Sequence, residues 1–356
     1  MSIADGVERM CYNPLLSGRY EVARVALVGC GAVAETFYLP AITKNPGLAR
    51  NMVLVDTDAS RAQAMAMKFR ISSYVQDYRD VIPNVHGAII TLPNHLHFKV
   101  SLDFLSAGVH VLCEKPLCET EEQAKTLVKE AETRKVFLSV NNTRRLFPSF
   151  KKVKELIEMG EIGEPLSFHI KEGLQFTWPT VSGFYFNPKH SKGGVLMDVG
   201  AHVVDLICWW FNSRPEVTAY TDDSFGGLES VAQLELQVMD SIHGSVRLSR
   251  LSTLSNQYII EGNKATIVCE PYNWQVIRLS KGGRTYSLHA PAHQRRYADF
   301  ATELINNFID TLCGHAVPRV QGKDVIDSIS VLEECYRKRQ RFQMPWEEVS
   351  TEDEEA

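Results

Sequence analysis

The feature that most constrains the fold is a glycine-rich turn between a short apolar run and a helical stretch. Residues 25–28 lead directly into Gly29-Cys30-Gly31-Ala32-Val33-Ala34, a G-x-G-x-x-A sequence. Gly29 permits a tight turn, Gly31 lets a pyrophosphate approach the backbone at the helix N-terminus, and Ala34 keeps helix and strand close. A strand, this turn and a helix predict a dinucleotide-binding unit, and a merely structural turn is the alternative.

An acidic residue after the next apolar run supports that prediction. Asp56 follows residues 52–55 and lies slightly beyond the usual interval of about 20 residues. Its carboxylate can accept both ribose hydroxyls of NAD, whereas the 2'-phosphate of NADP would meet a like charge. Arg61 keeps NADP as the alternative, because an arginine in this loop can pair with that phosphate. We therefore expect NAD.

The pattern of apolar residues extends the prediction to the first half of the chain. From residue 22 to about 140, short β-branched runs alternate with helical stretches, as βαβ units around a parallel sheet do. Strands are expected near 25–28, 52–55, 87–91, 110–113 and 136–140, and helices near 35–44, 59–69, 98–107 and 121–133. Thr120, followed by two acids, is a suitable start for the last of these helices.

The second half has a different texture. After a helix near 149–159, longer alternating strands are joined by turn residues such as Gly262-Asn263 and Gly282-Gly283, which suit tight hairpins. Strands are expected near 230–238, 241–248, 257–261, 265–270, 275–280 and 284–289, and helices near 299–312 and 322–338. These strands read as an antiparallel sheet.

The predicted fold class is therefore α/β, with an N-terminal Rossmann dinucleotide-binding domain and a C-terminal α+β domain that has a large, mainly antiparallel sheet. We expect an N-terminal extension at 1–22, the Rossmann domain at 23–145, a substrate-binding and oligomerisation domain at 146–345, and an acidic tail at 346–356.

Composition limits the partners. A net charge of -5 gives no general attraction to nucleic acid or to anionic lipid. The apolar runs are far shorter than the roughly 20 residues of a membrane-spanning helix, and the N-terminus does not resemble a secretory signal. Eight cysteines occur without a C-x-x-C pair or zinc-finger spacing. We expect a cytoplasmic protein with a small-molecule substrate and without nucleic acid, membrane or metal.

Three further segments follow the glycine-rich turn in order. They are Thr91-Leu-Pro-Asn94-His-Leu-His97, Ala107-Gly-Val-His-Val-Leu-Cys-Glu114-Lys115-Pro116 and Gly193-Gly-Val-Leu-Met-Asp198-Val-Gly-Ala-His202-Val-Val-Asp205. Together they resemble the glucose-fructose oxidoreductase/inositol dehydrogenase/MocA (Gfo/Idh/MocA) family, over nearly all of residues 25–339. The resemblance implies an NAD(P)-dependent oxidoreductase that moves a hydride to or from a secondary hydroxyl or ketone of a sugar, cyclitol or nucleotide-linked sugar.

The second segment places a lysine where open α/β folds bind their ligands. Glu114-Lys115-Pro116 comes just after an expected strand, and Pro116 disfavours helix at Lys115. A fixed ammonium there can stabilise a developing alkoxide. The resemblance implies that Lys115 contacts the reacting oxygen and that Glu114 helps to hold the cofactor ribose. An isolated lysine would more often be a solvated surface residue.

The third segment supplies a carboxylate and an imidazole. Asp198 and His202 are one helical turn apart and share a face. Histidine titrates near neutrality and can accept the carbinol proton, while Asp198 can orient it or hold a neighbouring hydroxyl. Gly193-Gly194 would make room for substrate or nicotinamide. A buried core histidine and a metal site with Asp205 are the alternatives.

Other candidates depend more on the resemblance. It places Thr91, Pro93, Asn94 and His97 beside the nicotinamide, although a histidine there could simply cap a helix. It also lets Arg144, in Arg144-Arg145-Leu-Phe-Pro148, reach the cofactor, although Leu146 stands where an aromatic is usual. An aromatic loop with three candidates could form a platform for a sugar ring, and core packing is the alternative. These candidates are Trp178, Tyr185 and Lys192.

Two other functions fit the same sequence. One is a glycosidase that retains NAD and uses transient oxidation. The other is a sensor that binds NAD without turnover, although such a protein has no need for Lys115, Asp198 and His202 together. The exposed face of an antiparallel sheet would normally be paired or covered, so we also expect a homodimer or homotetramer.

Overall fold

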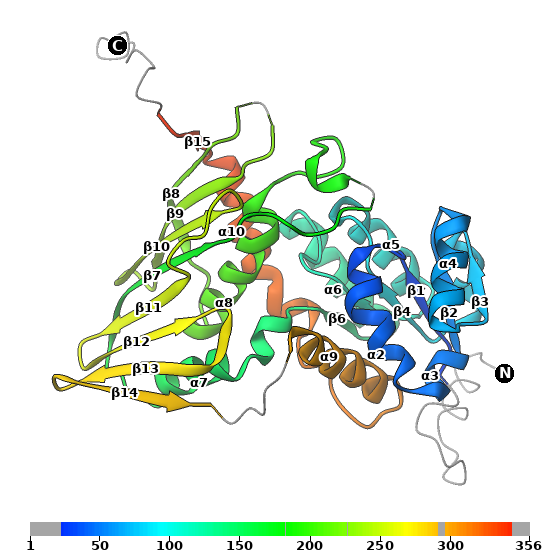
Figure 1. The fold of residues 1–356 in the computed structure, drawn as a ribbon, viewed down its shortest axis with the longest axis horizontal. Helices are drawn as coiled ribbons and strands as arrows, with labels where there is room; N and C mark the ends of the chain where they lie inside the picture. The colour runs from blue at the N-terminus through cyan, green and yellow to red at the C-terminus, as the bar shows by residue number, and fades with distance from the viewer. Residues whose placement is uncertain (1–22, 182, 226, 291–295, 344–356) are drawn as a thin grey trace.

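The computed structural model describes residues 23–181, 183–225, 227–290 and 296–343, so the expected extension 1–22 and acidic tail 346–356 lie outside the described residues. Two sheets dominate the molecule, one at each end of its long axis (Figure 1). This arrangement confirms the predicted α/β class with a second, mainly antiparallel sheet.

The first sheet is the parallel sheet expected of a Rossmann domain. Its six strands are all parallel and lie in the order β3-β2-β1-β4-β5-β6, so the order in which strands are added to the sheet reverses between β1 and β4, where such folds bind dinucleotides. The central strands are apolar and buried on both faces, as parallel strands are. The strands are β1 (Val25–Val28), β2 (Met52–Val55), β3 (Ser73–Val75), β4 (Gly87–Ile90), β5 (His110–Cys113) and β6 (Leu138–Val140).

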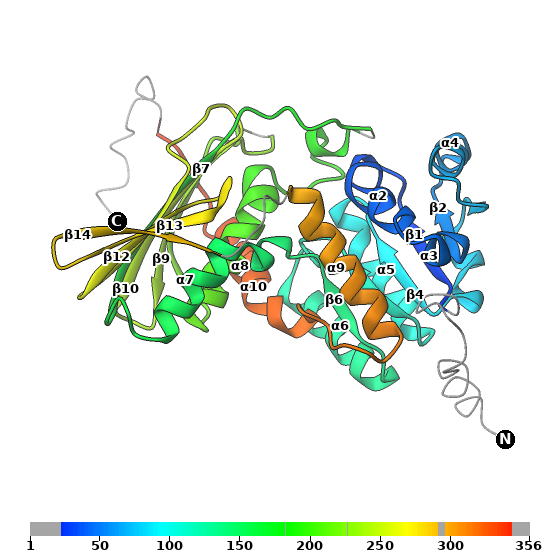
Figure 2. The same ribbon diagram turned by 60° about the horizontal axis from the view of Figure 1, so that its bottom comes forward.

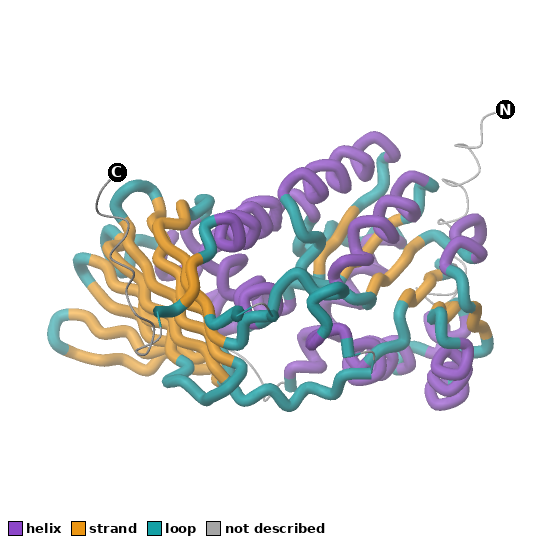
Figure 3. The backbone as a smooth tube through the Cα atoms, turned by 90° about the horizontal axis from the view of Figure 1, so that it is seen from above, coloured by secondary structure: helices purple, strands orange, loops and turns teal. Residues whose placement is uncertain are grey.

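Helices cover both faces of this sheet (Figure 3). Thr120 caps α6 by accepting from Gln123 N at 3.2 Å, as predicted, and Asp58 caps α4 by accepting from Ser60 N at 3.0 Å, which the sequence analysis did not predict. The helices are η1 (Ala34–Tyr38), α2 (Leu39–Thr43), α3 (Pro46–Arg50), α4 (Ala59–Phe69), α5 (Asn94–Ser106) and α6 (Glu121–Arg134), with short 3₁₀ turns at η2 (Tyr78–Asp80), η3 (Ile82–Asn84) and η4 (Thr143–Leu146).

The second sheet has nine strands in the order β14-β13-β12-β11-β7-β10-β9-β8-β15. Only β7 with β10 and β8 with β15 pair in parallel within the described residues. The helices α7 (Pro148–Glu158) and α8 (Ala201–Phe211) pack on its inner face, toward the first sheet (Figure 2). The strands are β7 (Pro165–Gly173), β8 (Glu216–Asp222), β9 (Val231–Val238), β10 (Ile242–Ser249), β11 (Gln257–Gly262), β12 (Ala265–Glu270), β13 (Asn273–Lys281), β14 (Arg284–His289) and β15 (Gln340–Arg341).

Two C-terminal helices tie the two halves together. Figure 2 shows α9 (Tyr297–Leu312) beside α2, on the first sheet. Gly87 of β4 leaves the room for this contact, because a Cβ there would lie 2.9 Å from the Leu312 side chain. After the turn η7 (Gly322–Val325), α10 (Ile326–Arg337) contacts both α6 and α8.

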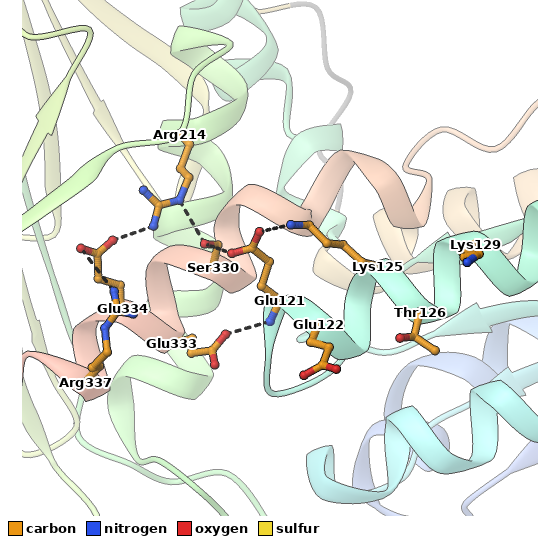
Figure 4. A pocket seen from close by; sticks show the side chains of 10 residues that line it. All are labelled: Glu121, Glu122, Lys125, Thr126, Lys129, Arg214, Ser330, Glu333, Glu334 and Arg337. Carbon is orange, nitrogen blue, oxygen red and sulfur yellow. Dashed lines mark hydrogen bonds and ion pairs between the residues drawn. The ribbon is translucent and has the colours of Figure 1, made fainter.

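A polar pocket of about 590 Å³ marks the junction of α10 with α6 (Figure 4). Ser330 Oγ donates to Glu121 Oε2 at 2.6 Å, and Arg214 Nε donates to Ser330 Oγ at 3.0 Å. Glu121 N donates to Glu333 Oε2 at 2.9 Å. These contacts connect the first domain with α10 and with the turn after α8. Within the described ranges, every helix is too short or too polar to span a lipid bilayer.

Candidate active site

The glycine-rich turn has the local geometry that a dinucleotide site requires. Gly29 has φ +102°, and a Cβ there would lie 2.7 Å from Thr91 O. Thr91 Oγ1 donates to Gly29 O at 2.7 Å, which joins the ends of β1 and β4. A Cβ at Gly31 would meet nothing within 4 Å. The turn therefore packs tightly on the sheet side and leaves open space on the side that a pyrophosphate would approach.

Asp56 closes the same turn from β2. Its Oδ2 accepts from Cys30 N at 2.9 Å and its Oδ1 accepts from Asp58 N at 2.9 Å. Arg61 Nη1 lies 3.7 Å from Asp56 Oδ2. The carboxylate is thus held rigidly at the turn, and each oxygen keeps a second lone pair for a ligand hydroxyl.

Glu114 lies inside the site rather than at its surface. Its Oε1 accepts from Tyr38 Oη at 2.7 Å and from Asn141 Nδ2 at 2.6 Å, and its Oε2 accepts from Lys115 N at 3.0 Å. Burial raises the pKa of Glu114 despite these donors. Sequence reasoning missed Tyr38 and Asn141, although the position of Asn141 directly after β6, at the ligand-binding edge of the sheet, was an available signal.

Lys115 reaches across to the second half of the molecule. Its Nζ donates to Asp198 Oδ1 at 2.8 Å and to Asp198 O at 3.0 Å. Arg250 Nη2 donates to the other carboxylate oxygen, Oδ2, at 2.9 Å. Burial opposes ionisation of Asp198, but the charges of Lys115 and Arg250 outweigh it and lower its pKa to about 2. The structure therefore brings together two predicted residues, and it adds Arg250.

His202 lies on the same helical segment and is 8% exposed. Burial lowers the pKa of His202 well below its usual range, and the charges of Lys115 and Arg144 lower it further. The ring is therefore neutral at neutral pH. Its Nδ1 is buried without a hydrogen-bond partner among the described residues.

The segment that carries Asp198 and His202 differs from the plain α-helix that we expected. Leu196–Gly200 is a π-helical turn, η6, and α8 begins only at Ala201. A second π-helical turn, η1, follows the glycine-rich turn. Such turns are rare and often occur at functional sites. Here both of them border the site.

The glycine pair before this segment also has another role than we expected. A Cβ at Gly193 would lie 1.7 Å from Tyr336 Oη, and a Cβ at Gly194 would lie 1.8 Å from Glu229 O. Glu229 Oε1 accepts from Gly194 N at 2.7 Å and from Leu196 N at 3.1 Å, so this buried carboxylate caps the segment. The glycines thus make room for protein rather than for substrate, and no motif in the sequence points to Glu229.

Several candidates make contacts other than those expected. His97 is fully buried, with Nδ1 and Nε2 each 2.7 Å from a carbonyl oxygen, of Pro116 and Leu92 respectively, so it holds these two turns. Arg144 forms a two-pronged ion pair with Glu172, both contacts at 2.7 Å, and its expected contact with the cofactor stays a prediction. Pro93 and Asn94 lie half-buried at the start of α5, beside the turn.

The aromatic loop divides between two places. Trp178 stacks on Phe37 of η1, with ring centroids 5.7 Å apart. Tyr185 lies closer to the chemistry, since its ring centroid is 5.5 Å from the Arg250 guanidinium, and burial together with Asp198 raises its pKa. Lys192 Nζ pairs with Glu119 Oε2 at 2.9 Å.

The third member of the alternative metal site points elsewhere. Asp205 pairs with Arg145 through two contacts of 2.8 and 2.7 Å. In the part of the chain that the structure describes, no group of three or more His, Cys, Asp or Glu side chains could hold a metal ion.

A parallel sheet with this strand order and a glycine-rich turn at its carboxyl edge are the features of a dinucleotide-binding fold. Family models agree. Residues 23–142 match "Oxidoreductase family, NAD-binding Rossmann fold", and residues 150–268 match "GFO/IDH/MocA C-terminal domain". The chain belongs to the Gfo/Idh/MocA oxidoreductase family, as its sequence predicted.

Individual relatives are distant. The chain is 28% identical to 1,5-anhydro-D-fructose reductase of Ensifer adhaerens, over 63% of this chain and 65% of that protein, which is less than two thirds. It is 27% identical to levoglucosan dehydrogenase of Pseudarthrobacter phenanthrenivorans, over 67% and 68%. The solved structure of a levoglucosan dehydrogenase in complex with NADH and levoglucosan has the same fold, with a TM-score of 0.78 at 20% identity, over 88% of this chain and 96% of that one.

Proposed function

We propose that this chain is an NAD(P)-dependent oxidoreductase that moves a hydride between the nicotinamide and a secondary hydroxyl or ketone of a sugar, cyclitol or nucleotide-linked sugar. One observation carries the proposal. Lys115, from the carboxyl edge of the Rossmann sheet, meets Asp198 from the second domain at 2.8 Å, next to a neutral buried histidine. The two matched relatives, a reductase and a dehydrogenase of sugar derivatives, support the substrate class.

The residues of the turn fit the cofactor. The open space at Gly31, the closed turn at Gly29 and the fixed carboxylate of Asp56 suit the pyrophosphate and the ribose of a dinucleotide. When bound, the nicotinamide accepts the hydride in oxidation and donates it in reduction. We infer a preference for NAD over NADP from the charge of Asp56.

The protein's own groups handle the charge and the proton. An ammonium has three hydrogens, and Lys115 donates two of its hydrogen bonds to Asp198, which leaves one for the reacting oxygen. That contact stabilises the alkoxide as it develops. In oxidation the hydroxyl proton passes to the neutral ring of His202, the carbinol C–H bond breaks as the hydride leaves, and the product is a ketone.

A panel of sugars, cyclitols and their ketones tests this function. The purified protein should reduce NAD when it is given at least one polyol, or oxidise NADH when it is given the matching keto-sugar. Either reaction changes the absorbance of the cofactor. A glycosidase that retains NAD would cleave a glycoside without net change in absorbance. A sensor would bind the cofactor without turnover on any member of the panel. Either result would defeat the proposal.

A further inference from the structure

Arg250 is a second cation in the site, and the function proposed above gives it no task. It follows the end of β10, where its backbone N donates to Ser230 O at 2.8 Å. Its guanidinium carbon lies 5.1 Å from the ring centroid of Phe176 and 5.5 Å from that of Tyr185. These two rings and the ion pair to Asp198 fix the guanidinium in one position, although arginine is normally a flexible side chain.

Two buried polar atoms around Asp198 lack partners among the described residues. Arg250 is 8% exposed, and its Nε–H donates to none of these residues. His202 Nδ1 is likewise buried without a hydrogen-bond partner among them. A buried donor without an acceptor is costly, so such atoms call for a ligand or ordered water. The Asp198 side chain itself remains 26% exposed, so it is not fully enclosed by its protein partners.

The groups of Arg250 and Asp198 favour a neutral hydroxyl as the ligand group between them. A hydroxyl can accept from Arg250 Nε and at the same time donate to a free lone pair of Asp198. A carboxylate can only accept, and it would lie against Asp198, which remains ionised because its pKa is about 2. Arg250 Nη2 is already paired with that carboxylate, so an anionic ligand would gain little from it.

The two cations sit on the two oxygens of one carboxylate. Lys115 contacts Oδ1 and Arg250 contacts Oδ2, so substrate oxygens bound by these two residues lie at neighbouring positions, as hydroxyls on adjacent ring carbons do. We propose that Arg250 is a specificity-determining residue that binds the hydroxyl on the carbon next to the reacting carbon, and that the substrate must carry a free, uncharged hydroxyl there. This inference rests on the proposed function.

The first test uses the unmodified protein. The best sugar from the substrate panel is compared with its mono-deoxy analogues at each carbon adjacent to the reacting one. One of these analogues should lose at least about 100-fold in kcat/KM, because a site built to bind a hydroxyl rejects a ligand that lacks it. Equal kcat/KM for the sugar and all these analogues overturns the inference and leaves the proposed function standing. Absence of turnover on every sugar overturns both.

Variants then assign the loss to Arg250. Arg250→Met should lower kcat/KM for the parent sugar by at least about 100-fold and leave the sensitive deoxy analogue nearly unchanged, so the gap between them closes. Arg250→Lys keeps the charge beside Asp198 but has no second nitrogen at the position of Nε, and it should also narrow the gap. The matched control is Arg247→Met, at an exposed arginine on β10, the strand that leads into Arg250, and it should preserve the gap. A gap of full size in folded Arg250→Met or Arg250→Lys contradicts the assignment.

Discussion

At the scale of single residues, the site depends on charges that the fold holds apart from water. Asp198 stays ionised between two cations, and His202 stays neutral because it is buried beside Lys115. The sequence motifs made Lys115, Asp198 and His202 candidates because each lies in a recognisable pattern, and the structure brings Lys115 and Asp198 together. They could not identify Arg250, which is 52 residues away in the chain from the carboxylate that it contacts. That contact depends on strand pairing in the second sheet.

His202 and Lys115 should act in the chemical step. We expect His202→Ala and Lys115→Ala to lower turnover by at least about 100-fold, because they remove a general base and a preorganised cation. The dissociation constant for NADH should change little. Steady-state kinetics and a fluorescence titration measure the two effects, with an unchanged melting temperature as the control. A folded His202→Ala protein with near-native turnover would assign the proton to another group.

His202 also determines how the rate of oxidation should depend on pH. Oxidation needs the neutral ring, and the pKa of His202 is lowered from its ordinary value of 6.5. The ring therefore gains a proton only at pH values below 6.5, so kcat/KM for oxidation should stay level as pH falls through 6.5 and should decline only at lower pH. His202→Ala should remove this acidic limb. An acidic limb centred at or above pH 6.5 that His202→Ala abolishes would contradict the lowered pKa of the buried His202 ring.

Asp56 should decide between the two dinucleotides. We expect tighter binding of NADH than of NADPH, since a 2'-phosphate would approach an anion, and we expect Asp56→Ser to narrow or reverse the preference. Arg61, 3.7 Å from Asp56 and 3.4 Å from Asp58 Oδ2, would then keep only the Asp58 carboxylate as a competitor for the phosphate. Fluorescence titration of both cofactors gives the ratio, and Asp80→Ser, which removes an exposed carboxylate, is the control. A native preference for NADPH would refute the assignment.

At the scale of helices and strands, local pattern was sufficient where an element is regular. The predicted ranges 59–69, 265–270 and 284–289 coincide with α4, β12 and β14. Pattern was insufficient at β7, where Phe168 and Ile170 alternate with polar residues but Pro165 and two charged residues favour a loop. Its place between β10 and β11 depends on pairing between distant segments, which a local pattern does not contain. The π-helical turn at Leu196–Gly200 was not predicted for the same reason. Its cap, Glu229, lies far away in the chain, just before β9.

That cap should position the catalytic segment. Glu229→Ala removes the acceptor for Gly194 N and Leu196 N, and we expect a loss of about 1–3 kcal/mol in stability and about a tenfold loss in kcat. Affinity for NADH should be retained, since the glycine-rich turn is not touched. Glu229→Gln keeps the acceptor oxygen and should restore most of kcat. If folded Glu229→Ala and wild type have equal kcat, the cap by Glu229 does not position Asp198 and His202.

At the scale of the whole molecule, the two sheets do not behave as separate bodies. The segment assigned from sequence to the second domain includes α9, which packs on the first sheet, and α10, which contacts both halves. Ile329 of α10 belongs to the apolar core around β4, β5 and β6, whereas Val331 and Leu332 belong to the core that extends under the nine-stranded sheet. The boundary at 145 and the homo-oligomeric state both stay predictions.

This shared helix leads to an expectation about unfolding. Ile329 is 2% exposed, so Ile329→Ala should destabilise the protein by about 2–5 kcal/mol through lost apolar contacts and a residual cavity. Three of the five tryptophans, Trp209, Trp210 and Trp274, pack in the core under the nine-stranded sheet, so fluorescence mainly monitors unfolding of that half, although Trp178 stacks on Phe37 of the first. If α10 couples the halves, the tryptophan midpoint in urea should fall together with the midpoint from far-ultraviolet circular dichroism, which monitors both. Met67→Ala, at a side chain that is 74% exposed on α4, should move neither midpoint.

One result would contradict this coupling: a tryptophan midpoint that stays in place while the dichroism splits into two transitions. The halves would then unfold independently, and the contacts in Figure 4 would join them without coupling their stability.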